Sequence, residues 1–519
     1  MLQLKNITIT HRKDLREIVK DFSFVLHPGD KAVIIGEEGN GKSTLLKLIY
    51  QEALIEPYAE YTGEIIRNGN RMGYLAQELS PEQKRGRVDE YFYQIPVFFE
   101  KTPKELGVLA RELGLSGSFF FEDREIRTLS GGEKVKMQMA GILLNQPDIL
   151  LLDEPSNDID LNTLEWLERF ISRSNLPVLY VSHDETFIRR TANVIVHMEQ
   201  VKRKTAARHT IAKMGYDQYI RERLNGLQRQ EQLARKERSE HDKQMERYRK
   251  IQQKVEHQQN VITRQDPHGG QLLKKKMHSV KAMGRRLEKQ QENRTELPDT
   301  EEAIFAAFSG DIRIPNGKII LDLTIDTLYT EEYGKKLAEN IHLRVQGPEK
   351  ICIVGRNGAG KTTLLSRIAE ELLKRTDIHA AYMPQNYEEL LEMEKTPVEF
   401  LQKSCDREEY GRIRTYLGSM KYTADEMEHS ISELSGGQKA KLLFLKMSMD
   451  GNDVLILDEP TRNFSPLSGP VIRQLLKNYG GAIISVSHDR NYVAEVCQKI
   501  YRLTEQRLEP VSAEFGKES

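Results

Sequence analysis

Two glycine-rich loops have the residue types and spacing of phosphate-binding sites. Residues 36–43 have the sequence GEEGNGKS, and residues 355–362 have GRNGAGKT; each follows a short apolar run and precedes a helix-like segment. In such a loop backbone N–H groups face phosphate, a lysine reaches the β- and γ-phosphates, and a hydroxyl binds Mg²⁺. The sequence therefore predicts two ATP–Mg²⁺ sites. Their nucleotide-binding residues are Gly36, Gly39, Gly41, Lys42, Ser43 and Thr44 in the first half, and Gly355, Gly358, Gly360, Lys361, Thr362 and Thr363 in the second.

Two acidic pairs follow buried, strand-like runs. ILLL precedes Asp153 and Glu154, and VLIL precedes Asp458 and Glu459. Parallel α/β sheets bind ligands at the carboxyl ends of their strands, which favours a site over an exposed acidic strand end. We expect Asp153 and Asp458 to hold Mg²⁺ directly or through water, together with the hydroxyls of Ser43 and Thr362. We expect the two glutamates to polarise the attacking water.

A histidine and a glutamine complete each predicted site. His183 and His488 each follow an apolar run, and each lies 29 residues after the glutamate of its half. A lone histidine is usually structural, but this repeated placement favours a γ-phosphate contact. Gln77 and Gln385 occupy matching positions between the glycine loops, and we expect both to act in catalysis.

A second glycine loop occurs in each half, LSGGE at residues 129–133 and LSGGQ at 434–438. A serine before two glycines at a helix start offers N–H groups and a hydroxyl to an anion. One nucleotide does not need two such loops from one domain. We therefore expect Ser130 and Gly132, and likewise Ser435 and Gly437, to serve a nucleotide bound elsewhere.

The matched order of these motifs indicates an internal duplication within 519 residues. We predict an α/β fold with two nucleotide-binding domains in tandem, at residues 1–205 and 301–519, joined by a helical linker at 206–300. The three cysteines form no zinc or disulfide pattern, and we find neither a signal sequence nor an apolar run of 18 residues. These features predict a cytoplasmic protein with no membrane segment.

The linker is basic. Residues 221–296 hold 20 lysines and arginines against 11 acidic residues, whereas the whole chain has a net charge of −1. Apolar residues recur at helical spacing from residue 224 onward, and residues 266–270, DPHGG, break the pattern. We predict an antiparallel helical hairpin with its tip near 256–272. The expected stripes are Met245, Tyr248, Ile251 and Val255 on one helix, and Leu273, Met277, Val280, Met283 and Leu287 on the other.

The excess charge has two interpretations, a solvated linker or a surface that contacts phosphate. Clusters at residues 247–250, 274–276 and 285–286 favour phosphate contacts. Structured RNA fits better than DNA, because RNA is recognised largely by shape and backbone and no DNA-reading module is visible.

These motifs resemble the ATP-binding cassette (ABC) proteins, in which LSGGE and LSGGQ are the signature. The resemblance covers both halves and implies two cassettes paired head to tail within a monomer, each ATP lying between the phosphate loop of one and the signature of the other. Both sites are then expected to hydrolyse ATP. Ser465 replaces the aspartate usual at its position, so the sites can differ in rate. Candidates for adenine stacking are Tyr329 or Tyr333 in the second half and His11 in the first.

Two cassettes joined by a basic hairpin resemble the ABC-F family of translation-associated ATPases. That resemblance implies binding to the ribosomal tRNA exit site, with the hairpin directed at large-subunit rRNA, P-site tRNA and the peptidyl-transferase centre. EPTRNFSPLSGPVIR at residues 459–473 resembles the branch that protects ribosomes from lincosamides, pleuromutilins and streptogramin A. The alternatives are a housekeeping translation factor, the ATPase subunit of a membrane transporter and a DNA-bound structural ATPase.

Overall fold

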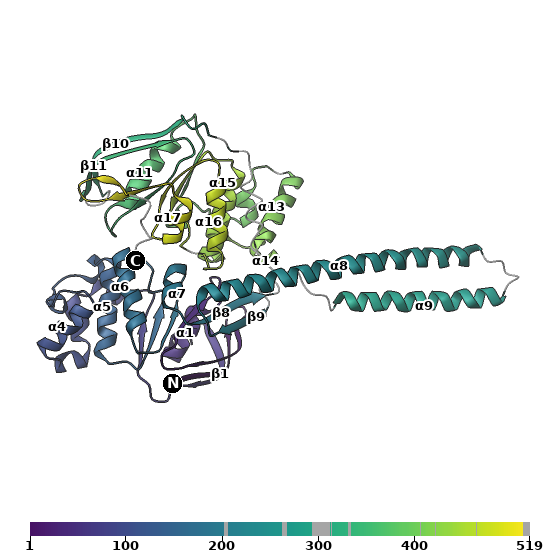
Figure 1. The fold of residues 1–519 in the computed structure, drawn as a ribbon, viewed down its shortest axis with the longest axis horizontal. Coiled ribbons are helices and arrows are strands. Elements are labelled where there is room, and N and C mark those ends of the chain that lie inside the picture. The colour runs from purple at the N-terminus through teal and green to yellow at the C-terminus, as the bar shows by residue number, and fades with distance from the viewer. Residues whose placement is uncertain are drawn as a thin grey trace. The chain divides into compact units, whose positions relative to one another are not determined.

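The computed structural model describes residues 1–201, 206–261, 267–292, 312, 314–330, 334–404, 406–420, 422–462 and 464–511. The chain divides into two compact units. One unit contains Met1–Tyr216 and Glu301–Ser519, and the other contains Asp217–Thr300 (Figure 1). Below, the first cassette denotes the described residues within 1–212, and the second cassette denotes those within 312–511.

A six-stranded sheet forms the centre of the first cassette, in the order β5-β6-β7-β3-β8-β9. All neighbours are parallel except β8 and β9. In register, Asp153 pairs with Val181, so the acidic pair and the segment leading to His183 leave the sheet at the same edge. The strands are β3 (Lys31–Ile35), β5 (Met72–Leu75), β6 (Ile149–Asp153), β7 (Val178–Val181), β8 (Val194–Val201) and β9 (Ala206–Ala212).

The second cassette repeats this sheet in the order β13-β14-β15-β12-β16-β17. Asp458 pairs with Val486, as Asp153 does with Val181. The predicted α/β duplication is therefore confirmed. The strands are β12 (Lys350–Val354), β13 (Ala380–Met383), β14 (Val454–Asp458), β15 (Ala482–Val486), β16 (Lys499–Leu503) and β17 (Leu508–Val511).

The antiparallel sheets differ between the cassettes. The first has three strands, β1 (Leu2–His11), β2 (Glu17–Leu26) and β4 (Ala59–Ile66), whereas the second has only β10 (Ile319–Tyr329) and β11 (Lys336–Gln346). The interval from Lys42 to Gln77 is 35 residues, against 24 from Lys361 to Gln385. The additional residues form the short helix η1 (Glu52–Leu54) and the strand β4.

Helices accompany these sheets, and α1, α5, α11 and α15 begin at the phosphate loops and signatures. In the first cassette they are α1 (Lys42–Tyr50), α2 (Pro81–Arg85), α3 (Val88–Tyr93), α4 (Pro103–Glu112), α5 (Gly131–Leu144), α6 (Leu161–Arg173) and α7 (Glu185–Thr191). In the second they are α11 (Lys361–Leu373), α12 (Pro397–Leu401), α13 (Arg407–Ser419), α14 (Ala424–Glu428), α15 (Gly436–Met449), α16 (Gly469–Asn478) and α17 (Arg490–Val496).

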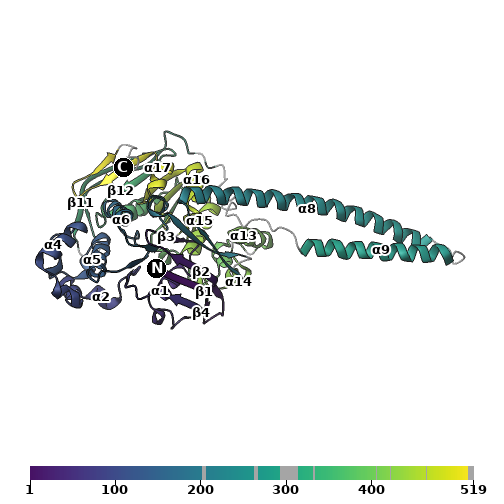
Figure 2. The same ribbon diagram turned by 60° about the horizontal axis from the view of Figure 1, so that its bottom comes forward.

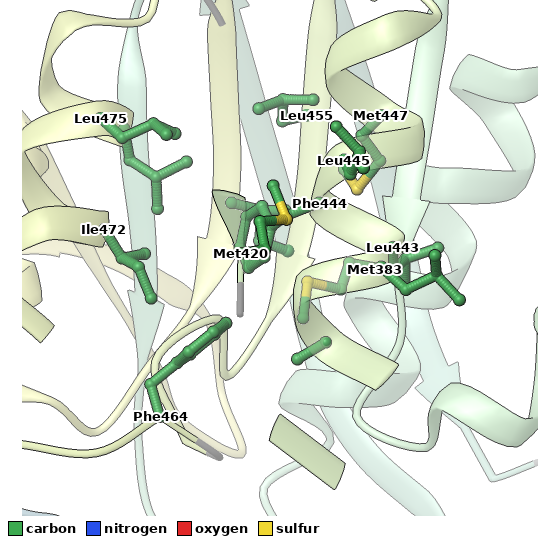
Figure 3. Close-up of a cluster of buried hydrophobic side chains, with 14 of the residues drawn as sticks. Met383, Met420, Leu443, Phe444, Leu445, Met447, Leu455, Phe464, Ile472 and Leu475 are labelled. Carbon is green, nitrogen blue, oxygen red and sulfur yellow. The ribbon is translucent and has the colours of Figure 1, made fainter. Parts of the chain in front are cut away.

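An apolar core anchors the loop that follows the second acidic pair. Phe464, which precedes α16, is 3% exposed, and its ring lies 5.9 Å from that of Phe444 on α15, centroid to centroid. Figure 3 shows these two side chains among Met420, Ile472 and their neighbours. Burying a phenylalanine stabilises the fold by roughly 1.5–3 kcal/mol, so this contact holds the backbone of residue 464 in place.

The second unit is a helical hairpin made of α8 (Tyr216–Val261) and α9 (Pro267–Glu292), which run side by side in Figures 1 and 2. Two details of the expectation are wrong. Helix α8 begins eight residues before Leu224. Pro267 begins α9 instead of lying in a break, because its fixed φ and missing N–H suit a first helical position; Asp266 lies outside the described residues.

The packed face of the hairpin agrees with the predicted stripes at Val255, Val280 and Leu287 and differs from them at two positions. Ile251 is 44% exposed and Met283 is 37% exposed. Gln252 is partly buried instead, and at buried Gly284 an added Cβ would lie 2.8 Å from the Tyr248 hydroxyl. A glycine thus faces an aromatic side chain between the helices, which simple apolar spacing does not predict. The side chain of Leu273 lies outside the described part. No described helix has both the length and the apolarity needed to cross a membrane.

Candidate active site

The phosphate loops curl around their own lysines. Gly41 and Gly360 adopt φ of 80° and 91° directly before α1 and α11, a conformation that glycine adopts without strain. The Lys42 ammonium donates to the carbonyls of residues 36 and 37 at 3.0 and 2.9 Å. Lys361 makes the equivalent bonds at 3.0 and 2.9 Å. Burial lowers the pKa of both lysines. Below, site one contains Lys42 and site two contains Lys361.

The loop geometry also explains Gly36. Its φ is 149°, and an added Cβ would lie 2.2 Å from the carbonyl oxygen of Met198 on β8. A side chain at this position would therefore push the loop away from the sheet. Gly39 and Gly358 have φ of 77° and 79°, again in the left-handed region. Ser43, Thr44, Thr362 and Thr363 occupy the first turns of α1 and α11.

The aspartates lie beside the helix hydroxyls. Asp153 accepts hydrogen bonds from Ser43 Oγ at 2.7 Å and from Tyr74 Oη at 3.3 Å. Burial and the neighbouring Glu459 raise the pKa of Asp458 to about 6. Its buried Oδ2 has no hydrogen-bond partner among the described residues. Carboxylate and hydroxyl oxygens are the donors that Mg²⁺ prefers, so these residues fit a magnesium ion held together with nucleotide phosphates.

The two glutamates differ in their surroundings. His183 Nε2 lies 3.0 Å from Glu154 Oε1, and its Nδ1 donates to the carbonyl of Phe464 in the second cassette at 2.9 Å. At site two, His488 Nε2 lies 3.8 Å from Glu459 Oε1, although the His488 backbone N–H donates to Oε2 at 3.2 Å.

Their pKa values move in opposite directions. Burial alone would raise the pKa of Glu154, but His183 and Lys42 outweigh burial and lower it. Burial raises the pKa of Glu459 to about 7 despite the His488 N–H, and burial with Lys361 lowers the pKa of His488 to about 4. Glu154 and Glu459 have φ of 49° and 50°, a strained conformation for residues other than glycine that is common at functional sites.

The signature serines cap helices. Ser130 accepts from the Glu133 N–H at the start of α5, and Ser435 accepts from the Gln438 N–H at the start of α15. The N–H of Gly437 donates to Glu38 Oε2, in the phosphate loop of the first cassette, at 2.5 Å. The second signature thus faces the phosphate loop of site one.

Site two contains a cavity of about 470 Å³. The Asn357 amide donates to the Asp158 carbonyl oxygen of the first cassette at 2.6 Å, and Arg462 pairs with the Asp158 carboxylate at 2.9 Å. Ser130 and Gly132 are not among the described residues that line this cavity. Its lining includes Asn157, Asp158, Ile159, Gly358, Gly360, Lys361, Thr362, Thr363, Gln385, Asp458, Glu459 and His488.

The remaining candidates lie at the periphery. Gln77 and Gln385 are exposed, and Gln385 lines the cavity of site two. Tyr329 is 53% exposed at the end of β10, next to Thr330 in the cavity wall, and Tyr333 lies outside the described residues. His11 Nδ1 lies 3.1 Å from Asp14, so that carboxylate already engages the ring.

The segments after the acidic pairs differ as their sequences do. Asp160 caps α6 by accepting from the Thr163 N–H at 2.9 Å. Ser465 instead contacts Ser468 Oγ at 2.9 Å, and α16 begins only at Gly469. A serine and a following proline therefore start the second helix later than an aspartate starts the first.

Two matched α/β domains with phosphate loops and acidic strand ends, with the second signature facing the phosphate loop of site one, define a protein with two nucleotide-binding domains. The chain belongs to the ABC transporter family, whose model matches residues 19–157 and 338–462. It is accordingly an ATPase, as the sequence predicts.

Relatives of known name lie in the ABC-F group. ABC transporter F family member 5 of Arabidopsis thaliana is 26% identical over 96% of this chain and 74% of the relative. Ribosome protection protein VmlR of Bacillus subtilis (strain 168) is 28% identical over 92% of this chain and 82% of the relative. A solved structure titled RNase-L Inhibitor has a TM-score of 0.57 at 18% identity, covering 99% of this chain and 92% of that chain. The resemblance to ABC-F proteins is thereby confirmed, and the solved structure agrees in fold.

Sequence reasoning missed three groups at these sites, namely Glu38, Tyr74 and the pair of Asp158 with Arg462. One signal was available for Glu38, because its loop carries two acids where the second loop has Arg356 and Asn357. Tyr74 lies on β5, three residues before Gln77, a position that Tyr382 repeats in the second cassette. The Asp158–Arg462 pair depends on how the cassettes meet, and no local pattern reveals it.

Proposed function

We propose that this chain is a ribosome-binding ABC-F ATPase that uses ATP binding and hydrolysis to act at the tRNA exit site and the peptidyl-transferase centre. In this proposal it contacts large-subunit rRNA and P-site tRNA. It thereby confers resistance to ribosome-targeting antibiotics of the lincosamide, pleuromutilin and streptogramin A type.

The observation that carries this proposal is the basic surface of the hairpin. Val255, Val280 and Leu287 are buried in the hairpin, while Arg247, Lys250, Arg285 and Lys274–Lys276 are exposed. Exposed lysines and arginines on a rigid helical pair suit the phosphate backbone of folded RNA, and they make affinity depend on salt. VmlR, named a ribosome protection protein, aligns over 92% of the chain, which is more than the two cassettes alone.

The two sites would couple ATP to this binding. Bound ATP supplies γ-phosphate oxygens, and the Gly437 N–H that now contacts Glu38 is placed to bind such an anion. Glu154 and Glu459 accept a proton from the attacking water, with His183 and His488 beside them. ATP binding would favour the state in which the two cassettes are paired, and ATP hydrolysis would let them separate. The contacts to ATP would thus control the populations of the two states.

Drug tolerance in a sensitive bacterial host tests the resistance function. Cells that express the chain should grow at higher concentrations of at least one of the three drug classes than cells that express the Lys42→Ala, Lys361→Ala variant. If tolerance does not rise while the protein still binds ribosomes, the resistance function is wrong and the housekeeping role is favoured.

Replacing residues 256–272 with a short neutral turn tests the tip. We expect drug tolerance to fall while ribosome binding in a pelleting assay persists. Lys274–Lys276→Gln is the matched control: it should weaken ribosome binding and make its dependence on salt shallower by roughly two to three units in log–log slope. Retention of both properties in the tip variant would exclude this role for the tip.

A housekeeping factor that relieves stalled ribosomes is the second candidate. Its support is that ABC transporter F family member 5, whose name mentions no drug, aligns over 96% of this chain. The subunit of a membrane transporter is the third, and stable copurification with an integral membrane protein would support it.

A further inference from the structure

Two buried ion pairs join the cassettes, and Glu185 of one pair also lines the cavity of site two. Arg473 on α16 donates to Glu185 on α7 through both terminal nitrogens, at 2.6 and 3.1 Å. Arg490 on α17 pairs with Glu168 on α6. The four side chains are between 4% and 9% exposed. These pairs are therefore largely shielded from water and salt.

The two pairs are related by the internal duplication. Glu168 and Arg473 each lie 14 residues after the glutamate of their half, and Glu185 and Arg490 each lie two residues after the histidine. Equivalent positions thus carry opposite charges. The first cassette presents two acids to the interface and the second presents two bases.

The surroundings are built for these charges. An added Cβ at Gly469 would lie 2.2 Å from Glu185 Oε1, so only glycine leaves room for the carboxylate. Arg473 Nε also donates to Glu495 at 3.0 Å, and Arg190 donates to the second oxygen of Glu168 at 2.9 Å. A buried charge without its partner is strongly destabilising. A surface of this kind therefore rejects any partner that lacks the complementary charge.

We propose that Glu168, Glu185, Arg473 and Arg490 form a charge code that pairs the first cassette with the second and opposes pairing of two like cassettes from different copies. In a pair of first cassettes, Glu185 would face Glu168. In a pair of second cassettes, Arg490 would face Arg473. Both arrangements bury like charges. The code keeps each nucleotide site composed of unlike halves.

Reversing one charge should redirect the pairing. In Arg473→Glu the contact with Glu185 becomes repulsive, whereas two second cassettes become complementary because each then carries one acid and one base. We expect the full-length variant to form dimers as its concentration rises, measured by light scattering on a sizing column. Its ATP turnover should fall at least about tenfold, since loss of a buried charge pair is worth that much or more.

Two further variants separate this code from ordinary destabilisation. Glu185→Arg with Arg473→Glu restores the pair within one chain, and we expect a monomer with turnover within about threefold of the parent, because the tether favours the intramolecular pair. Arg473→Glu with Arg490→Glu makes every pairing repulsive, so it should be monomeric with low turnover. Reversal of the partly exposed pair Glu349–Lys499 within the second cassette is the matched control and should change neither property.

The proposal is overturned if Arg473→Glu stays monomeric with parental turnover, if the charge swap does not restore both properties, or if the doubly acidic variant dimerises as readily as the single one. Should Arg473→Glu be insoluble, the swap still decides: a soluble, active monomer supports the code, and an insoluble swap refutes it.

Discussion

At site one, the Glu38 carboxylate accepts the Gly437 N–H at 2.5 Å, and His183 contacts both Glu154 and the Phe464 carbonyl. At site two, Asn357 donates to the Asp158 carbonyl at 2.6 Å instead, and a cavity of about 470 Å³ lies beside the loop. The candidate catalytic groups are repeated in both sites, yet their contacts differ. At site one, the Glu38 carboxylate already occupies the N–H of the second signature. At site two, a cavity lies next to Lys361.

The two loop contacts differ at one equivalent position. Glu38 and Asn357 both lie two residues after the first glycine of their loops. A carboxylate only accepts hydrogen bonds, so it turns to an N–H, whereas an amide nitrogen donates to a carbonyl. The residues that the two loops share are the candidates for binding ATP. The residues that differ, such as Glu38 and Asn357, decide which contacts ATP would have to displace.

The largest expected effect comes from the general bases. Glu154→Gln with Glu459→Gln should lower ATP turnover by about 100-fold or more, because a positioned base contributes about that factor. Each single variant then reports on the other site. The ATP turnover that remains in Glu154→Gln comes from site two, and the turnover that remains in Glu459→Gln comes from site one. We expect the turnover of site two to reach half its maximum at a lower ATP concentration than that of site one. Equal values would contradict the inequality of the sites, and exposed Glu64→Gln serves as the control.

The next effect concerns the internal anion. In the Glu459→Gln background, Glu38→Gln should lower the half-saturating ATP concentration of site one by about tenfold, since a hydrogen bond to a charged group is worth about 1.5 kcal/mol or more. Glu37→Gln removes the same charge one residue away and should change it less. The converse variant, Asn357→Glu in the Glu154→Gln background, should weaken ATP at site two. No response to either change would show that Glu38 does not compete with nucleotide.

The smallest effect concerns the aspartates. Tyr74 donates to Asp153, whereas Tyr382 contacts Ser366 Oγ at 3.3 Å. Tyr74→Phe should raise the Mg²⁺ concentration needed for half-maximal ATP binding at site one by about threefold, because the hydrogen bond to Asp153 is long, at 3.3 Å, and a typical hydrogen bond contributes only about 0.5–1.5 kcal/mol. Fluorescent ATP binding measured across a Mg²⁺ series reports this directly. A similar shift at site two in Tyr382→Phe would remove the distinction between the two tyrosines.

Much of this comparison was predictable from the sequence. The phosphate loops, acidic strand ends and capped signature serines are local patterns, and each structure forms within a few residues of its motif. The duplication followed from their repeated order. The hairpin was predictable from helical spacing, although Ile251 and Met283 proved exposed and Gly284, which the spacing did not include, is buried against Tyr248.

What could not be predicted depends on contacts between distant segments. The partner of Glu38 is a backbone N–H 399 residues away, and that of Glu185 is an arginine 288 residues away. Neither contact leaves a local pattern, because both depend on how one cassette meets the other. The unequal pKa values of Glu154 and Glu459 likewise follow from burial and neighbouring charges, and the matched motifs around them give no sign of the difference.

The most direct test of the proposed function is pelleting with ribosomes. The Glu154→Gln, Glu459→Gln variant should hold ATP without hydrolysing it and remain in the paired state. It should therefore cosediment with ribosomes more strongly in ATP than the parent chain does, and lose this advantage in ADP or when Lys42 and Lys361 are also changed to Ala. Cosedimentation no stronger than that of the parent would contradict an ATP-dependent ribosome-binding state.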